Sequence, residues 1–322
     1  MTTIKTAIIG GAGYTGGELV RLLIHHPHVE IAYIHSNSQK NKPVTSTHPD
    51  LLGETDLLFT DAVQTEGIQA VFLALPHGET KSFLDTHPFA EDTIIIDLST
   101  DFRDESHDFV YGLPEINLTT IQQAKKIANP GCFATGIQLA LAPAISKGWV
   151  KDTIHVSGIT GSTGAGKKLA DTSHFSYRTN NLSVYKLFTH QHLKEIRQTF
   201  KHLDPSFGGE ILFVPYRGNF TRGIWITAYF PFEGSEEEAI QTYQEFYKDA
   251  AFTFVSVQDI DLKQVINTNK CILHVQKEGG MLVIYSAIDN LLKGAAGQAI
   301  QNFNIALGFS QQTGLQLKSI AF

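Results

Sequence analysis

The stretch AIIGGAGYTGGELVRLL, residues 7–23, joins a short apolar run to a cluster of glycines and an amphipathic segment. Gly11, Gly13 and Gly16 fit the spacing G-x-G-x-x-G, and with Gly10 as the first member the cluster also fits G-x-x-G-x-x-G. Glycines let the backbone turn tightly and approach a pyrophosphate, whose charge the free amides and positive end of the next helix hold. Because a strand precedes the cluster and a helix follows it, the stretch predicts a Rossmann-type dinucleotide-binding domain rather than a structural glycine turn.

The first 130 residues continue this pattern. Apolar runs at residues 5–10, 28–34, 70–76 and 93–99 alternate with helix-like segments. Strands that alternate with helices indicate a parallel sheet.

After residue 150 the runs are longer and few helices separate them, which favours a second, mainly antiparallel sheet. These runs are residues 153–160, 210–216, 222–230, 270–276 and 281–288. Ser235 and Glu238 have the spacing of a capping box, and residues 293–307 form a closing helix-like run. We therefore expect an α/β chain in which residues 1–131 and 293–322 form the dinucleotide-binding domain. Residues 132–292 then form a second, α+β domain.

Composition excludes several classes of function. The net charge is -7 over 322 residues, so nothing resembles a basic footprint for nucleic acid. No run approaches the roughly 18 apolar residues of a membrane span, and no signal-peptide pattern opens the chain. We expect a cytoplasmic protein whose two cysteines, Cys132 and Cys271, are reduced thiols.

The segment after the second predicted strand bears on the choice of cofactor. An NAD enzyme places an acidic residue there for the ribose 2'-hydroxyl, whereas this chain reads HSNSQKNK at residues 35–42. Ser36, Ser38 and Lys40 have groups that can meet a 2'-phosphate, although they also suit an ordinary polar loop. The segment favours NADP over NAD.

The segment GSTGAGK, residues 161–167, matches the phosphate-binding pattern G-x-x-x-x-G-K. A P-loop requires a Ser or Thr after the lysine to hold Mg²⁺, and this chain has Lys168. We expect a glycine-rich loop that borders the substrate pocket instead.

Cys132 lies in NPGCFATG, residues 129–136, directly before an apolar run that resembles a helix. Asn129 suits an N-cap and Pro130 the first helical position, which would put Cys132 in the first turn. Unpaired amides and the helix dipole there favour thiolate over thiol, so Cys132 is a candidate nucleophile. The alternative, an inert buried cysteine, suits Cys271 in its strand-like run.

A cysteine nucleophile needs a proton-transfer partner, and the segment THQHLKEI contains His190, His192 and Glu195. If this segment is extended, both imidazoles share a face; if it is helical, Glu195 lies three residues from His192 and can hold its ring. Metal ligation by the two histidines is disfavoured because no further ligands stand at typical spacing. We expect no metal site.

The stretch DLSTDFR, residues 97–103, follows a predicted strand and offers Ser99 and Arg103. Ligands bind at the carboxyl edge of a parallel sheet, and an arginine there can grip a phosphate through two hydrogen bonds. A surface salt bridge is the alternative role for Arg103.

These motifs together resemble the N-acetyl-gamma-glutamyl-phosphate reductase family, which belongs with aspartate-semialdehyde dehydrogenase and shares the two-domain architecture of glyceraldehyde-3-phosphate dehydrogenase. The similarity runs from Gly10 to Asn304, and the block around Cys132 is its most specific part. The segments that carry it are residues 10–23, 74–80, 97–103, 111–115, 129–136, 157–167, 190–196, 218–224 and 289–304.

The resemblance implies a role for each matching residue. Cys132 would be the nucleophile and His192 the acid and base, held by Glu195. The implied cofactor contacts are Gly10, Gly13, Tyr14, Thr15, Gly16, Ser36, Ser38, Pro76 and Gly164. The implied substrate contacts are Ser99, Arg103, Asn129, His190 and Arg217.

The implied reaction is the NADPH-dependent reduction of an N-acetylated glutamyl phosphate to the semialdehyde and inorganic phosphate through a cysteine thioester, in arginine biosynthesis. The implied assembly is a homo-oligomer, either a dimer or a tetramer, in which residues 132–292 would be the α+β catalytic and dimerisation domain. Two departures stand out. Gln191 occupies a position where the family usually has Arg, and Tyr216-Arg217 stands where it often has His-Leu.

Two rival functions are an aspartate-semialdehyde-type dehydrogenase and a catalytically silent NADP-binding sensor. In the first, the catalytic histidine is expected much further beyond the cysteine than His192 lies. The second would have no reason to keep both the Cys132 block and the His192 block.

Overall fold

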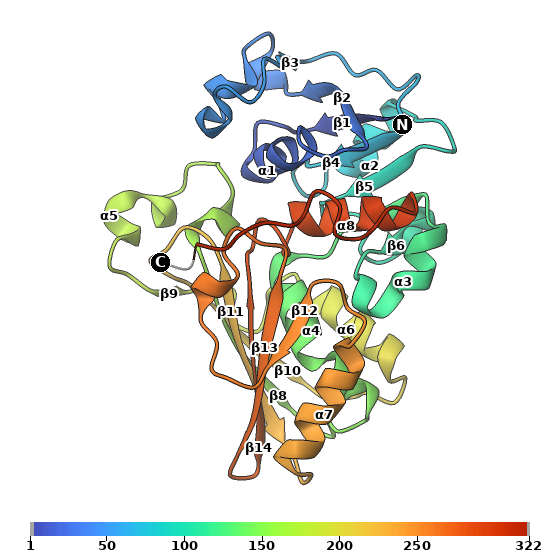
Figure 1. Cartoon of the computed structure of the whole chain (residues 1–322). Helices are drawn as coiled ribbons and strands as arrows, with labels where there is room; N and C mark the ends of the chain where they lie inside the picture. The colour runs from blue at the N-terminus through green and yellow to red at the C-terminus, as the bar shows by residue number, and fades with distance from the viewer. Residues whose placement is uncertain (1–2, 321–322) are drawn as a thin grey trace. The chain divides into compact units, whose positions relative to one another are not determined.

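A computed structural model describes residues 3–320, which form two compact units (Figure 1). The first unit contains Met1–Gly131 and Ala295–Gln316, and the second contains Cys132–Gly294 and Leu317–Phe322. Residues 1–2 and 321–322, the outermost residues of our expected first domain, lie outside the described residues. Among the described residues, no helix has the length and apolar character needed to span a bilayer.

The first unit is built on a seven-stranded sheet with the order β3-β2-β1-β4-β5-β7-β6. Every pairing in it is parallel, as the alternating pattern predicted. Its strands are β1 Ile4–Ile9, β2 Val29–His35, β3 Phe59–Thr60, β4 Ala70–Leu73, β5 Ile94–Asp97, β6 Val110–Tyr111 and β7 Lys126–Ala128. The order reverses between β1 and β4, and ligands bind at such switch points in doubly wound sheets.

Helices of the first unit pack on this sheet through apolar faces. They are α1 Tyr14–Leu23, α2 Thr80–Thr86, α3 Pro114–Gln123 and α8 Ala296–Ala306, with short 3₁₀ turns at Asn37–Gln39, Val44–Ser46, Pro49–Leu51 and Ser106–Asp108. Leu19, Val20 and Leu23 of α1 are fully buried, and α8 packs against α1 and α3. The predicted closing helix is therefore confirmed as α8, which is shorter than residues 293–307.

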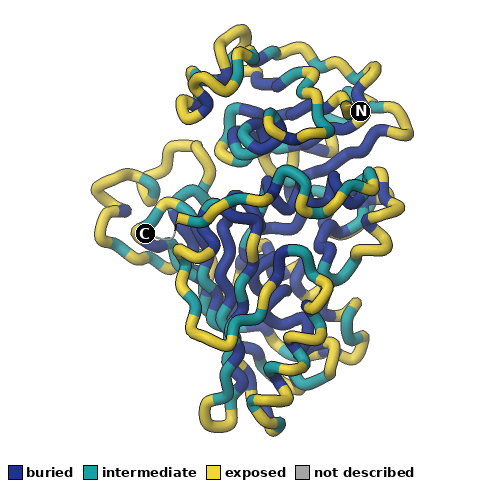
Figure 2. Tube along the Cα trace, in the orientation of Figure 1, coloured by how far each residue is buried: buried dark blue, intermediate teal, exposed yellow. Residues whose placement is uncertain are grey.

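The second unit has a seven-stranded sheet with the order β12-β13-β14-β11-β8-β10-β9. Only the pairs β8–β10 and β12–β13 are parallel, so the prediction of a mainly antiparallel sheet is confirmed. Its strands are β8 Ile154–Thr160, β9 Ser183–Val184, β10 Ile211–Arg217, β11 Ile224–Pro231, β12 Thr253–Ser256, β13 Cys271–Glu278 and β14 Met281–Ile288. Buried and partly exposed residues alternate along these strands, so one face packs on the core; Figure 2 shows the buried strand interiors of both units.

The core of the second unit is centred on α4, Cys132–Ser146, whose residues from Phe133 to Ile145 are all buried. The other helices are α5 Phe175–Arg178, α6 Leu193–Leu203 and α7 Glu236–Tyr247, with 3₁₀ turns at Ser162–Ala165, Asp171–Ser173 and Leu262–Gln264. Pro143 inside α4 has no N–H to donate to the carbonyl of Leu139. The hydroxyl of Tyr247 donates to that carbonyl instead, at 2.6 Å, and so fastens α7 to α4.

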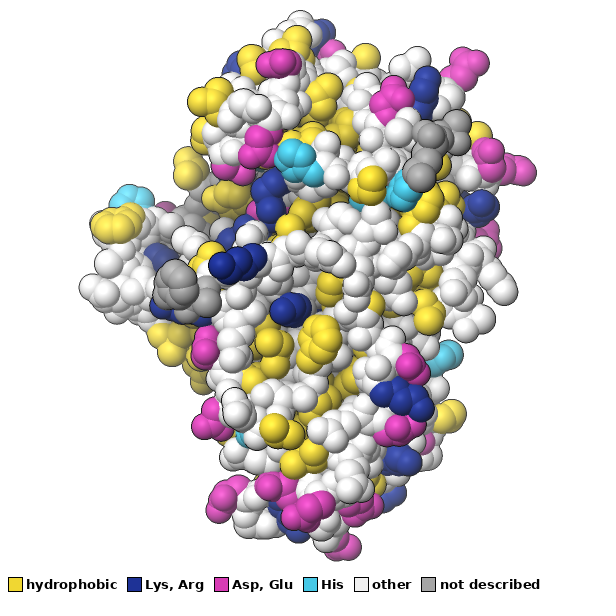
Figure 3. All heavy atoms as spheres, viewed as in Figure 1, with side chains coloured by type: hydrophobic (Ala, Val, Ile, Leu, Met, Phe, Trp, Pro, Cys, Tyr) yellow, Lys and Arg dark blue, Asp and Glu magenta, His cyan; other side chains and the backbone are white. Residues whose placement is uncertain are grey.

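The start of α7 follows the sequence prediction. The Ser235 hydroxyl accepts a hydrogen bond from the Glu238 amide at 3.1 Å, which caps the helix. Three acidic side chains, Glu236, Glu237 and Glu238, stand in the first turn of α7. Acidic side chains are also prominent at the lower end of the face shown in Figure 3. Negative charge in a first helical turn stabilises the helix through its dipole.

Candidate functional site

The glycine loop between β1 and α1 has the geometry that a pyrophosphate site requires. Gly10 has a φ of +83°, and a Cβ there would lie 2.3 Å from the Ala74 carbonyl oxygen. A Cβ on Gly16 would lie 2.6 Å from the Gly10 carbonyl oxygen, so neither position can carry a side chain. Helix α1 begins at Tyr14 after Gly13, and its first amides have no acceptor within the helix. The predicted loop therefore presents backbone amides at a helix N-terminus.

His48 supports this loop and was missed by sequence reasoning. Its buried ring places Nε2 2.8 Å from the Gly11 carbonyl oxygen. A Cβ on Gly17 would lie 2.5 Å from the same ring, so Gly17 is small because His48 packs on it. Nothing in the local sequence pairs residue 48 with residue 11, since the contact depends on the tertiary fold.

The segment after β2 brings the two predicted serines together. The amides of Gly10 and Gly11 both donate to the His35 carbonyl, so the glycine loop and the end of β2 are adjacent. The hydroxyls of Ser36 and Ser38 lie 3.5 Å apart. Lys40 forms an ion pair with Asp61 at 2.7 Å, so its charge is already partly neutralised.

Ser99 lies at the carboxyl end of β5, as expected, but its hydroxyl is engaged inside the first unit. It donates to Asp97 at 2.7 Å and accepts from the amide of Asp101 at 3.0 Å. Burial raises the pKa of Asp97, which also accepts a hydrogen bond from Thr80 at 3.0 Å. Asp101 in turn accepts from the amide of Gly78 at 2.7 Å, in the loop that carries Pro76. Ser99 thus supports the Pro76 loop from within.

Arg103 is buried at the carboxyl edge of the first sheet. Its Nε donates to the Asn129 carbonyl at 2.9 Å and its Nη2 to the Leu98 carbonyl at 3.1 Å. These carbonyls follow β7 and β5, so the predicted location of Arg103 is confirmed. Arg103 is 7% exposed, so it is not a surface residue.

Asn129 does not cap α4, because the helix begins at Cys132. The Asn129 carboxamide donates to the Ala295 carbonyl at 3.0 Å and accepts from Asn302 at 3.1 Å. The expected N-cap at Asn129 and first helical position at Pro130 are therefore wrong, since tertiary partners take the side chain that would cap. The expectation that Cys132 lies in the first helical turn is confirmed.

Cys132 is the first residue of α4 and is partly exposed, whereas Cys271 is buried. The Cys271 sulfur lies 3.5 Å from the Ser286 hydroxyl, in the middle of a sheet. The two cysteines thus differ in the way that the sequence predicted: one is at an accessible helix N-terminus, and the other is a packed core residue.

The histidine segment adopts the helical alternative near its end. His192 directly precedes α6, and its Nε2 lies 3.9 Å from the Glu195 carboxylate; both side chains are buried. The His190 ring packs edge-on against Phe133, the neighbour of Cys132, and against the His192 ring, with centroids 5.5 and 4.6 Å apart. Burial, reinforced by Lys186, lowers the pKa of His190 to about 4. His190 is therefore neutral at physiological pH.

Tyr185 joins this cluster and was not predicted. Its ring lies 5.8 Å from that of His190 and 4.9 Å from the guanidinium of Arg217, which stacks on it. Burial raises the pKa of Tyr185, and negative charge on Cys132 raises it further, while Arg217 opposes the rise. Tyr185, on which Arg217 stacks, is thus within electrostatic reach of the nucleophile candidate.

Two other arginines of the second unit are fixed by internal contacts. Arg178 donates to the carbonyls of Thr172 and Arg217 and to the hydroxyl of Ser183. Arg222 makes an ion pair with the buried carboxylate of Asp289 at 3.0 Å. In contrast, the buried Nε of Arg217 has no hydrogen-bond partner among the described residues.

The loop of residues 161–167 is a glycine-rich connection, with a 3₁₀ turn at Ser162–Ala165. The amides of Ser162 and Thr163 donate to the carbonyls of Phe220 and Thr221, so the loop is bound to a neighbouring loop of the second unit. Gly164 is exposed in this loop, and its predicted cofactor contact stays a prediction. Within the described residues, no group of three or more His, Cys, Asp or Glu side chains is arranged to hold a metal ion.

Comparison with protein families defines the class. The model "Semialdehyde dehydrogenase, NAD binding domain" matches residues 5–124, and "Semialdehyde dehydrogenase, dimerisation domain" matches residues 132–290. The chain belongs to the semialdehyde dehydrogenase family, whose dinucleotide-binding and dimerisation domains it contains.

Individual relatives narrow this class. N-acetyl-gamma-glutamyl-phosphate reductase of Christiangramia forsetii is 53% identical over 98% of this chain and 99% of that protein. The enzyme of the same name from Bacteroides thetaiotaomicron is 50% identical over 99% of this chain and 100% of that protein. Within the class, the chain is a member of the N-acetyl-gamma-glutamyl-phosphate reductase family.

Solved structures show the same fold at much lower identity. Aspartate semialdehyde dehydrogenase II of Vibrio cholerae, complexed with ASA, has a TM-score of 0.75 at 14% identity and covers 96% of this chain and 99% of its own. Aspartate semialdehyde dehydrogenase of Candida albicans, solved with NADP, has a TM-score of 0.69 at 15% identity and covers 94% and 98%. The predicted two-domain fold is confirmed.

Proposed function

We propose that this chain reduces N-acetyl-gamma-glutamyl phosphate with NADPH, giving N-acetyl-L-glutamate 5-semialdehyde and phosphate, as a step of arginine biosynthesis. The observation that carries the proposal is a partly exposed cysteine at the first residue of α4, in a chain about half identical to reductases of that name. A buried His192–Glu195 pair in the same unit supports it.

The nucleophile is Cys132. Its thiolate attacks the acyl carbon of the acyl phosphate, a carbon–sulfur bond forms, and the bond to the phosphate oxygen breaks. The amide at the start of α4 stabilises both the thiolate and the negative oxygen of the tetrahedral intermediate. The product of this step is a thioester on Cys132 and free phosphate.

The first unit fits NADPH. The loop of Gly10, Gly13, Tyr14, Thr15 and Gly16 would hold the pyrophosphate, because its backbone is tightly turned at Gly10 and Gly16 and the first amides of α1 have no acceptor within the helix. The hydroxyls of Ser36 and Ser38 would hold the 2'-phosphate, and the exposed Pro76 loop would border the cofactor. NADPH, when bound, supplies the hydride that reduces the thioester.

His192 moves the proton. Reduction of the thioester leaves an alkoxide, which a protonated His192 converts to a thiohemiacetal; the new hydroxyl must lose that proton again as the carbon–sulfur bond breaks. An imidazole nitrogen of His192 takes this proton, and the Glu195 carboxylate 3.9 Å away stabilises the resulting positive charge. The aldehyde leaves and Cys132 returns to thiolate.

Charged groups bind the two anionic ends of the substrate. Arg217 is the candidate for the α-carboxylate, since Arg178 and Arg222 are occupied by internal contacts and the Nε of Arg217 has no hydrogen-bond partner among the described residues. Neutral His190 packs near it and offers a further hydrogen bond. Arg103 would bind the phosphate. Ser99 and Asn129 contribute by supporting the Pro76 loop and the strand ends.

The same proposal includes a homo-oligomer, either a dimer or a tetramer, located in the cytoplasm. The match of the second unit to a dimerisation domain supports self-association. Sedimentation of the purified protein tests it, and a monomer at micromolar concentration would contradict it.

The proposal is tested in the dehydrogenation direction. N-acetylglutamate semialdehyde, phosphate and NADP⁺ should give NADPH, which is followed by its absorbance. The reaction should require phosphate and should be lost in Cys132→Ser, while Cys271→Ser should retain it. Preference for aspartate semialdehyde over the acetylated substrate would refute the proposed substrate.

A further inference from the structure

The turn Asp289–Gly294 has no role in the chemistry above, yet it touches the nucleophile. A Cβ built on Gly294 would lie 2.8 Å from the Cys132 Cβ and 2.7 Å from the Asn290 carbonyl oxygen. Both separations are shorter than real Cβ atoms show. A side chain at residue 294 would therefore displace either the backbone of the turn or Cys132 itself.

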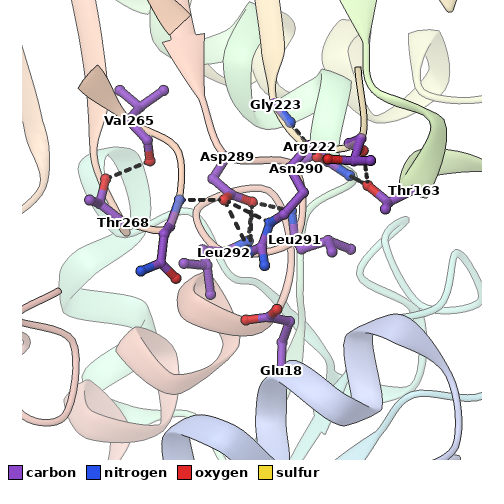
Figure 4. A network of polar contacts seen from close by, with 12 residues as sticks. Glu18, Thr163, Arg222, Gly223, Val265, Thr268, Asp289, Asn290, Leu291 and Leu292 are labelled. Carbon is purple, nitrogen blue, oxygen red and sulfur yellow. Dashed lines mark hydrogen bonds and ion pairs between the residues drawn. The ribbon is translucent and has the colours of Figure 1, made fainter. Parts of the chain in front are cut away.

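Hydrogen bonds within the turn fix Gly294 in this place. The Gly294 amide donates to the Asp289 carbonyl at 2.9 Å. The fully buried Asp289 carboxylate accepts from the amides of Leu291 and Leu292 at 2.8 and 3.2 Å (Figure 4). It also accepts from the amide of Asn267 at 2.7 Å. One carboxylate thus organises the turn and ties it to the segment before β13.

Arg222 supplies the charge that makes this burial possible. Its Nε and Nη2 donate to the two carboxylate oxygens of Asp289 at 3.1 and 3.2 Å. A buried carboxylate is costly unless it is paired and hydrogen-bonded, and a two-pronged arginine contact also fixes its orientation. The pair joins residues 67 positions apart in the sequence.

Asn290 extends the network to the glycine-rich loop. Its Oδ1 accepts from the Gly223 amide at 2.7 Å, and its Nδ2 donates to the Thr163 hydroxyl at 3.1 Å. The Thr163 hydroxyl donates to the Thr221 carbonyl at 2.6 Å. Three loops are therefore joined in one network, which includes Gly294 beside the Cys132 Cβ.

We propose that Asp289 and Gly294 are positioning residues for the nucleophile: the network holds Gly294 against Cys132, and this contact fixes the thiol at the start of α4. The inference rests on the proposed role of Cys132 in thioester formation. It assigns a function to the segment DNLLKG, residues 289–294, and explains why residue 294 is a glycine. Displacement of Cys132 from the helix N-terminus removes the amide that favours its thiolate.

The first test is Gly294→Ala, with Gly280→Ala as the matched control, because a Cβ on Gly280 meets no atom within 4 Å. We expect Gly294→Ala to lower kcat roughly 100-fold, the size of effect that a misplacement of about 1 Å produces. Alkylation of Cys132 by iodoacetamide should slow in the same variant, with Cys132→Ser as the blank. NADPH affinity should match that of Gly280→Ala, whereas Tm should be somewhat lower than in Gly280→Ala because the new Cβ meets the backbone of Asn290.

Arg222→Lys and Arg222→Gln test the network without placing a new atom beside Cys132. Lys keeps the charge but not the two-pronged contact, so kcat and the alkylation rate should fall less than in Arg222→Gln, with NADPH affinity unchanged in both. Thr163→Val, at a partly exposed position, should cause a smaller loss in the same two measurements.

Wild-type kcat and alkylation rate in folded Gly294→Ala would overturn the inference. So would a loss of activity that follows Tm alone across the Arg222 variants. The alkylation rate does not depend on the substrate, so a wild-type protein that failed to reduce N-acetyl-gamma-glutamyl phosphate would refute the proposed function and leave the positioning comparison intact.

Discussion

Arg217→Gln is the change that most directly tests how the substrate is held. The guanidinium stacks on Tyr185 at 4.9 Å, and its buried Nε has no hydrogen-bond partner among the described residues. A charge-assisted hydrogen bond contributes about 1.5–3 kcal/mol. Since each 1.36 kcal/mol is a factor of ten, loss of this contact should lower kcat/KM for the aldehyde by about 10- to 150-fold.

Variants of Tyr185 separate the contribution of the Tyr185 side chain to kcat/KM from that of the Arg217 charge. Tyr185→Phe keeps the ring under the guanidinium but removes the side-chain hydrogen bond between Tyr185 and Arg217, so it should lower kcat/KM by less than Arg217→Gln does. Tyr185→Leu removes a cation–π contact that contributes about 0.5–1 kcal/mol at a partly exposed site, so a loss of about 2- to 5-fold is expected.

The assay is the initial rate of NADPH formation with the aldehyde varied at saturating phosphate and NADP⁺, and then with phosphate varied. Arg197→Gln, which removes the same charge from an exposed position of α6, is the control and should behave as wild type. The reasoning fails if Arg217→Gln leaves kcat/KM for the aldehyde unchanged, or if it lowers kcat/KM for phosphate as much as kcat/KM for the aldehyde.

Further predictions concern the other proposed residues. Cys132→Ser should abolish turnover and keep NADPH binding, and substantial residual activity would exclude a covalent mechanism. Ser36→Ala with Ser38→Ala should reduce the preference for NADPH over NADH, whereas equal use of both cofactors by the wild type would show that these serines do not read the 2'-phosphate. Arg103→Ala should raise KM for phosphate far more than KM for the aldehyde; the reverse would move Arg103 to the carboxylate. Because the pKa of His190 is lowered to about 4, the folded protein binds fewer protons than the unfolded chain between about pH 4 and 6.5. The free energy of unfolding should therefore fall with decreasing pH across that window. Denaturant unfolding measured at several pH values should show a smaller dependence of this free energy on pH in folded His190→Gln than in the wild type.

Strong local patterns made the fold predictable. The long apolar runs became β1, β2, β4 and β5 in the first sheet and the longer strands of the second. The two-residue strands β3, β6 and β9 were not foreseen, because two residues carry no periodicity and pair only where the tertiary fold brings them.

The candidate site was predictable only where it rests on neighbours in sequence. His192 and Glu195 meet because one helical turn separates them, which the spacing shows. The local sequence favours Asn129 as a helix cap, but its carboxamide instead makes hydrogen bonds with Ala295 and Asn302, which lie far along the chain. Ser99 is different: its bond to Asp97, two residues earlier, is a local contact that the pattern Asp-x-Ser could have suggested.

The boundary between the two units has a consequence for how such a chain can arise. The chain leaves the first unit after Gly131 and returns at Ala295. The Asn129 side chain bonds the Ala295 carbonyl at 3.0 Å, so the two exit points of the first unit are adjacent; Cys132 and Gly294, the matching ends of the second, are also in contact. Apart from the residues after Gln316, the second unit is thus one insertion into a single connection of a nucleotide-binding host. A segment with adjacent ends can be inserted or exchanged without redirecting the host's strands. Cys132, the proposed nucleophile, is the first residue of this insertion, so a chimera that received residues 132–294 would also receive His192 and Glu195, the proposed proton-transfer pair.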